Sequence, residues 1–198
     1  MTPGAAARLV NVSVYQAGWF ACVLGGASGR PWLGAATGLS LVLVHLALVE
    51  RRAEETKLVA LAALAGTAVD SAQQAAGTVA LPSGHYAAWL CPAWLTVMWA
   101  QFATLPCHSL AWFAGRPVTC ALLGAAGGPL AFFAGERLGG VTFPSGRAVG
   151  YGVLALVWAA AFPLLMHFAA RSGAFPGRYR WQQTARGPAS GPGGEVGS

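Results

Sequence analysis

Residues 148–170 read AVGYGVLALVWAAAFPLLMHFAA, a run without Asp, Glu, Lys or Arg. A helix rises about 1.5 Å per residue, so this run would extend for about 34 Å and cross the roughly 30 Å hydrocarbon core of a bilayer. More apolar segments precede it, at about 9–26, 32–49, 57–77, 86–105 and 117–136. These runs are continuous rather than alternating, which excludes a transmembrane β-barrel. The sequence therefore predicts an all-α bundle of about six transmembrane helices within residues 1–171.

The composition also indicates a membrane protein. Hydrophobic residues make up 56% of the 198-residue chain and charged residues only 9%, whereas soluble domains carry about 25% charged residues. The net charge of +6 could indicate a nucleic-acid partner, but the basic residues lie between the apolar segments rather than in one patch. We therefore expect membrane lipids, and no nucleic acid, as partners.

The positions of the basic residues predict the orientation of the bundle. With six crossings, the N-terminus, the second and fourth loops and the C-terminal tail share one side of the membrane. That side would carry Arg8, Arg51, Arg52, Lys57, Arg116, Arg171, Arg178, Arg180 and Arg186, against Arg30, Arg137 and Arg147 on the other. Because basic residues accumulate on the cytoplasmic side, both termini are predicted to be cytoplasmic.

The tail, residues 172–198, is expected to form a cytoplasmic segment outside the bundle. Residues 178–181 combine two arginines with Tyr179 and Trp181 and are predicted to lie on anionic headgroups. From Gly187 onward the tail consists mainly of Gly, Pro and Ser. Such a sequence has little to bury, so we predict that it is disordered.

The third apolar segment carries the polar residues that most need an explanation in lipid. One helical stripe contains Gly66, Asp70, Gln73, Gln74 and Gly77. Asp70 would lie roughly 18 Å from the cytoplasmic end, where an ionised carboxylate costs about 2.5–3.5 kcal/mol. It is therefore expected to face the bundle interior beside a polar partner. The candidate partners are Gln16, Tyr15, Asn11 and Gln101.

These considerations define a set of candidates for an intramembrane polar pocket. The set is Asp70, Gln73, Gln74, Gln16, Asn11, Gln101, His108 and Glu136. His108 is expected at the cytoplasmic mouth of the pocket. Glu136 stands beside Arg137 near the outer surface, where a snorkelling interfacial pair is the simpler interpretation. No catalytic residue is assigned from the sequence.

No metal or cofactor is predicted from local motifs. His45, His108 and His167 all fall toward the cytoplasmic ends of their segments, but they form no His-x-x-x-His or His-Glu-x-x-His motif. Convergence of these separate histidines is the less favoured alternative. The cysteines are not arranged as C-x-x-C pairs and are interpreted as small packing residues.

Several of these stretches carry a family resemblance. They are Asn11 with 16–25 (QAGWFACVLG), 70–71 (DS), 108–112 (HSLAW), 127–131 (GGPLA) and 135–139 (GERLG). Over roughly residues 9–170 the chain resembles the bacterial family catalogued as domain of unknown function 2878. The resemblance implies a small multi-pass protein of the bacterial inner membrane, and it supplies no catalytic residues.

Three hypotheses for the function stay open at this point. In the first, the protein holds or acts on a lipid, with Asp70 as a base or hydrogen-bond anchor. In the second, it is a small proton- or cation-coupled transporter in which Asp70 is the ion site. In the third, it is a noncatalytic subunit whose polar stripe packs against a protein partner or a second copy. Whether the protein is an enzyme, and on which substrate, is left open.

Overall fold

The computed structural model describes residues 3–184, and the regular secondary structure in this range is helical. The main helices are α1 (Pro3–Ala27), α2 (Pro31–Leu48), α3 (Arg52–Ala75), α4 (Ala93–Phe102), α5 (Pro117–Arg137) and α6 (Arg147–Arg171). A short 3-10 helix, η1 (Ala111–Phe113), follows α4, and the four-residue helix α7 (Trp181–Thr184) ends the described chain. The prediction of an all-α bundle with about six helices is confirmed.

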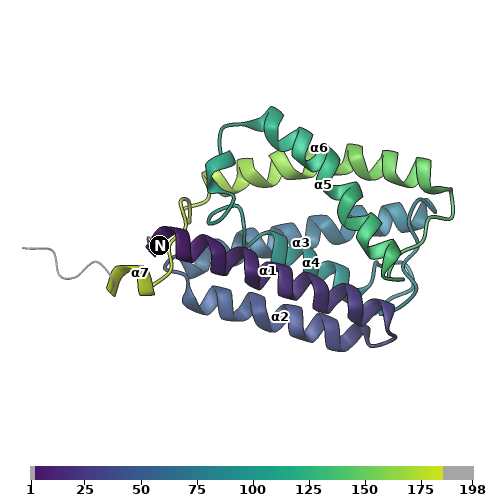
Figure 1. Cartoon of the computed structure of the whole chain (residues 1–198), viewed down its shortest axis with the longest axis horizontal. Helices are drawn as coiled ribbons and strands as arrows, with labels where there is room; N and C mark the ends of the chain where they lie inside the picture. Colours follow the sequence, from purple (N-terminus) through teal and green to yellow (C-terminus); the bar gives the residue numbers. More distant parts are fainter. Residues whose placement is uncertain (1–2, 185–198) are drawn as a thin grey trace, which may run out of the picture.

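The helices form three layers. Figure 1 shows α1 and α2 along one side, α5 and α6 along the other, and α3 and α4 between them. Helix α4 packs against α1, α2 and α3, whereas α5 packs mainly against α6. The turns before α2 and α5 are tight because Gly29 (φ 71°) and Gly115 (φ 79°) adopt the left-handed conformation. The α5–α6 hairpin is thus a separate unit laid against the rest of the bundle.

Four helices, α1, α2, α5 and α6, are long and apolar enough to cross a membrane. Their outward faces carry large apolar side chains such as Leu122, Leu130 and Leu156, which are 67%, 67% and 75% exposed. Helix α3 is 24 residues long, but Asp70 and two glutamines interrupt its apolar sequence. The chain is a multi-pass membrane protein.

The fourth helix is shorter than the predicted segment 86–105. It has 10 residues, which gives a length of about 15 Å. The chain before it is irregular, and both ring nitrogens of His85 lie 2.8 Å from carbonyl oxygens, those of Leu81 and Leu90. Non-helical backbone at membrane depth is tolerated where protein encloses it, and Cys91 and Pro92 are fully buried here.

The start of the tail docks onto one end of the bundle, the end at which α1 begins (Figure 1). The N–H of Arg180 donates to the carbonyl of Leu48 (2.9 Å), and that of Glu50 donates to the carbonyl of Arg178 (3.0 Å). Tyr179, expected at the lipid headgroups, is instead buried, while Arg178 and Arg180 are exposed. The predicted disordered stretch, 187–198, lies outside the described residues.

Candidate functional site

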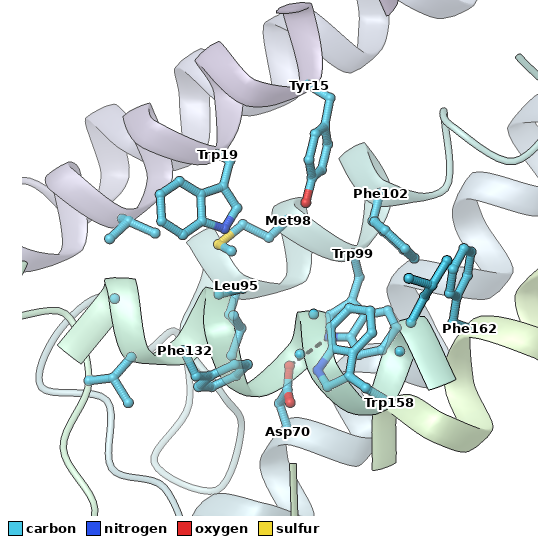
Figure 2. Close-up of a pocket in the computed structure, with 18 of the residues that line it drawn as sticks. Tyr15, Trp19, Asp70, Leu95, Met98, Trp99, Phe102, Phe132, Trp158 and Phe162 are labelled. Carbon is cyan, nitrogen blue, oxygen red and sulfur yellow. Dashed lines mark hydrogen bonds between the residues drawn. The ribbon is translucent and has the colours of Figure 1, made fainter. Parts of the chain in front are cut away.

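An apolar cavity of about 270 Å³ lies between the α5–α6 hairpin and helices α1, α3 and α4. Aromatic and aliphatic side chains, together with glycines of α5, form most of its wall. In Figure 2, Tyr15 and Trp19 project from α1 toward α4, and Asp70 lies on the opposite side near Trp99 and Trp158. Among the described residues that line the cavity, Asp70 carries the only carboxyl group.

Asp70 is buried and held by two hydrogen bonds. Trp99 donates from Nε1 to Oδ2 (2.6 Å), and Gln73 donates from Nε2 to Oδ1 (2.9 Å). The indole ring reaches the carboxylate because Gly66, one turn earlier on α3, has no side chain. A Cβ atom at Gly66 would lie 2.1 Å from the Trp99 ring. Within the predicted stripe, Gly66 therefore leaves room for the Trp99 ring and Asp70 accepts its hydrogen bond.

Trp158, which stacks on Trp99 in the cavity wall, has a buried N–H group that donates to no described residue. The rings of Trp99 and Trp158 stack with centroids 4.8 Å apart and an interplanar angle of 3°. Gly128 of α5 backs Trp158, since a Cβ there would lie 2.2 Å from its ring. The Nε1 atom of Trp158 is buried and has no hydrogen-bond partner among the described residues. Buried N–H groups without a partner are rare and call for an explanation.

The cavity continues toward the outer surface between α1 and α5. An adjoining groove of about 670 Å³ shares Tyr15, Trp19, Gly127 and Ala131 with the cavity. Its outer wall includes Phe20, Leu130 and Phe133, which are exposed on the face expected to meet lipid. At Gly127 a Cβ atom would meet no described residue within 4 Å. This glycine therefore borders open space where cavity and groove meet.

The predicted pocket residues do not all gather around Asp70. Gln73 is its neighbour. Gln74 does not line the cavity, and its buried Oε1 atom has no partner in the part of the chain that the structure describes. Gln16 is exposed and lies on the groove. The expected partners of Asp70 were wrong, because the indole of Trp99 from α4 occupies the position foreseen for a polar residue of α1 or for Gln101.

Asn11 and Gln101 connect helices instead of lining the cavity. Asn11 donates from Nδ2 to the carbonyl of Thr104 (3.1 Å) and accepts from Ser109 Oγ (2.7 Å), which joins α1 to the turn after α4. The side chain of Gln101, from α4, reaches between α1 and α2, where it lies against Gly18 and Gly38. Its Nε2 atom donates to Cys22 Sγ at 3.4 Å. These two buried residues tie α4 and its following turn to the first hairpin.

Glu136 lies apart from the cavity, at the opposite end of the bundle from the two ends of the described chain (Figure 1). It accepts hydrogen bonds from Arg147 Nε (2.8 Å) and from the Tyr151 hydroxyl (2.6 Å). Arg147 is largely exposed. The sequence suggested Arg137 as the partner in an interfacial pair, and the structure shows Arg147 in that role.

A buried cluster lies at the end of the bundle where the tail docks. His45 Nε2 is 2.8 Å from Glu55 Oε2, and His108 Nε2 is 2.9 and 3.0 Å from the two oxygens of the same carboxylate. The Tyr179 hydroxyl lies 3.1 Å from His45 Nδ1. Burial raises the pKa of Tyr179 above its ordinary value, so its hydroxyl is neutral at pH 7. His108, expected at the mouth of the Asp70 pocket, belongs to this cluster.

Glu55 and Tyr179 were not expected from the sequence to be members of a site. Glu55 lies in the charged stretch 50–57, whose composition is typical of a solvated loop, and Tyr179 lies in the tail. The cluster is assembled from segments that are far apart in the chain. In the sequence, the only hint of convergence was that His45 and His108 both fall toward the cytoplasmic ends of their predicted segments.

Residues 8–164 match the family described as "Protein of unknown function (DUF2878)". The chain belongs to this family. The match confirms the resemblance found in the sequence. The matched range contains Asp70, His45, Glu55 and His108 and ends before Tyr179. No curated protein and no solved structure matches the chain.

Proposed function

We propose that this protein binds a membrane lipid, with part of a hydrocarbon chain in the aromatic cavity and an oxygen-bearing group of that lipid near Trp158 and Asp70. The observation that carries the proposal is the combination of an apolar wall with a buried, unpartnered indole N–H. Ligand sites of this kind are mostly apolar and use a few polar groups to fix orientation.

The dimensions favour partial enclosure of a long ligand. Small-molecule sites measure about 300–1,000 Å³, so the cavity of about 270 Å³ would take a section of a chain rather than a whole lipid. The groove between α1 and α5 would hold the remainder. Its exposed outer wall gives a lateral path from the bilayer, which suits a ligand that arrives dissolved in lipid.

The polar groups favour a lipid over an inorganic cation. Hard cations take about six to eight oxygen ligands, whereas the neighbours of Asp70 in the cavity are mainly aromatic rings. The Trp158 N–H would donate to a carbonyl, ester or hydroxyl oxygen of the lipid. An unpaired buried donor costs about 1–3 kcal/mol, and a ligand oxygen would recover much of this cost.

The polar stripe of α3 also bears on the subunit hypothesis. Gly66, Asp70 and Gln73 are buried within the bundle, so the stripe is not available to pack against another protein. A partner would have to use another surface. The lipid hypothesis is therefore the one that the described residues support best.

Filling the cavity should remove the lipid. We expect Gly127→Leu to lower the amount of lipid that stays bound through purification at least tenfold, because its side chain would occupy the space between cavity and groove. Native mass spectrometry of the detergent-purified protein measures this occupancy. Leucine is a better helix former than glycine by up to about 1 kcal/mol, so the thermal unfolding temperature should not fall.

The matched control is Gly152→Leu on α6. Gly152 is also exposed, and a Cβ atom there would also meet nothing within 4 Å, but it lines neither the cavity nor the groove. This variant should retain lipid as the wild type does. Equal lipid occupancy in the wild type and in Gly127→Leu would refute the proposed site.

The orientation is part of the same proposal: both termini face the cytoplasm of a bacterial cell, and the protein lies in its inner membrane. The two ends of the described chain lie at the same end of the bundle (Figure 1), and the basic residues favour the cytoplasm for that end. Reporter fusions at Gly84 and Gly187 should therefore report opposite sides. Reporters on the same side would contradict this topology.

A further inference from the structure

We propose that His45, Glu55 and His108 form a binding site for a divalent transition-metal ion of the zinc type. Each offers one ligand atom, and these atoms all lie within 4.8 Å of one another. Zinc bonds of about 2.0–2.1 Å in tetrahedral geometry place ligand atoms about 3.3 Å apart. The carboxylate oxygens lie 2.8–3.0 Å from the two Nε2 atoms, so these oxygen–nitrogen contacts need to lengthen by only a few tenths of an ångström to reach that spacing.

The charge of the cluster favours a bound cation. The Glu55 side chain is 3% exposed, and its ion-pair partners among the described residues are the two imidazoles. The nearest arginines in sequence are used elsewhere, since Arg51 donates to the carbonyl of Gly173 and Arg52 to that of Leu46. A buried carboxylate needs a compensating positive charge. A divalent ion would supply it without protonation of either histidine.

The surroundings of the His45 ring match those of a metal-ligating histidine. Such imidazoles almost always donate their second N–H to an oxygen, which fixes the ring. With Nε2 of His45 on the ion, its Nδ1–H would donate to the Tyr179 oxygen 3.1 Å away. The other ring is fixed by packing, because Gly177 lies so close that a Cβ atom there would be 2.6 Å from His108 Nε2.

The donor set selects the class of ion. Two imidazoles and one carboxylate are a recurring set for zinc, with the fourth position taken by water or another ligand. Magnesium and calcium prefer oxygen ligands alone. The three donors come from the end of α2, the first turn of α3 and the turn after α4, so the ion would also hold this end of the bundle together.

The test uses full-length protein with a histidine-free affinity tag, stripped with a chelator and titrated with Zn²⁺ or Co²⁺. Bound metal per chain is measured by elemental analysis after desalting, and Co²⁺ also gives a visible ligand-field spectrum. We expect one ion per wild-type chain, and loss of that ion in His45→Gln and His108→Gln. Tyr179→Phe should weaken binding about 10–100-fold, as removal of an outer-sphere partner does.

Two controls separate this site from other effects. His167→Gln removes an exposed histidine of α6 that lies outside the cluster and should bind metal as the wild type does. Gly127→Leu should also leave metal binding unchanged, so the metal site and the lipid cavity can fail independently. If His45→Gln does not fold, the unfolding temperature of the wild type tests the metal site instead. It should rise when Zn²⁺ is added.

The proposal is overturned if the wild type binds neither Zn²⁺ nor Co²⁺. It is also overturned if the folded variants His45→Gln and His108→Gln bind as much metal as the wild type. In either case the cluster is a hydrogen-bonded network only.

Discussion

Replacing Glu55 by leucine is expected to lower the free energy of unfolding by about 2–6 kcal/mol. Two buried imidazoles, His45 and His108, direct Nε2 at its carboxylate. Without the carboxylate both ring N–H groups lose their acceptor, and each unpaired buried donor costs about 1–3 kcal/mol. Denaturant unfolding in detergent, with chelator present, measures the contribution of the network without any metal.

The adjacent Glu54 provides the matched control. It pairs with Lys57 at 3.1 Å, three residues on, and the two side chains are 39% and 73% exposed. Solvent-exposed pairs contribute at most about 1 kcal/mol, so Glu54→Leu should change stability little. If Glu55→Leu proved as mild as Glu54→Leu, the cluster would not hold this end of the bundle together.

Gly66→Ala is the second substitution with a large expected effect. Its Cβ atom would lie 2.1 Å from the Trp99 ring, so the indole must move and its hydrogen bond to Asp70 is lost. Overpacking of this kind costs about 1–3 kcal/mol, and the broken bond adds about 1 kcal/mol. The gain in helix propensity, up to about 1 kcal/mol, offsets only part of this loss. Thermal unfolding in detergent measures the net effect.

Two comparisons identify Trp99 as the cause. Gly127→Ala, where a Cβ atom meets nothing within 4 Å, should be neutral or slightly stabilising. In a Trp99→Leu background, Gly66→Ala should cost much less than in the wild type, because the clash and the hydrogen bond are both gone. A cost that is unchanged in that background would show that the tight contact with Trp99 is not responsible.

Local pattern was enough to predict much of the fold. The long apolar runs marked α1, α2, α5 and α6 to within a few residues, apart from the earlier start of α1. The fourth segment was placed less well, because its apolar content fits either a helix or an enclosed irregular chain. What shortens the helix is the bonding of His85 to two carbonyl groups and the packing around Pro92, and neither is visible in hydropathy.

The same limit explains the candidate sites. Gly66, Asp70 and Gln73 could be grouped because they recur on one face of a single helix. The partner Trp99 is 29 residues away from Asp70 in sequence, and no local spacing connects the two. The buried cluster around Glu55 was harder still to predict from the sequence. Glu55 and His108 are 53 residues apart, and only the packed bundle brings them together.

Photolabelling tests the central claim, a lipid chain inside the aromatic cavity, most directly. The protein is placed in vesicles that contain a phospholipid with a photoreactive acyl chain, and labelled residues are mapped by mass spectrometry. Leu95 and Met98 of α4 line the cavity, and Leu95 is only 4% exposed, whereas Leu156 is 75% exposed on the outer face. We expect label at all three positions in the wild type, and loss of the α4 label alone in Gly127→Leu. Label at Leu156 without any at Leu95 or Met98 in the wild type would contradict the account.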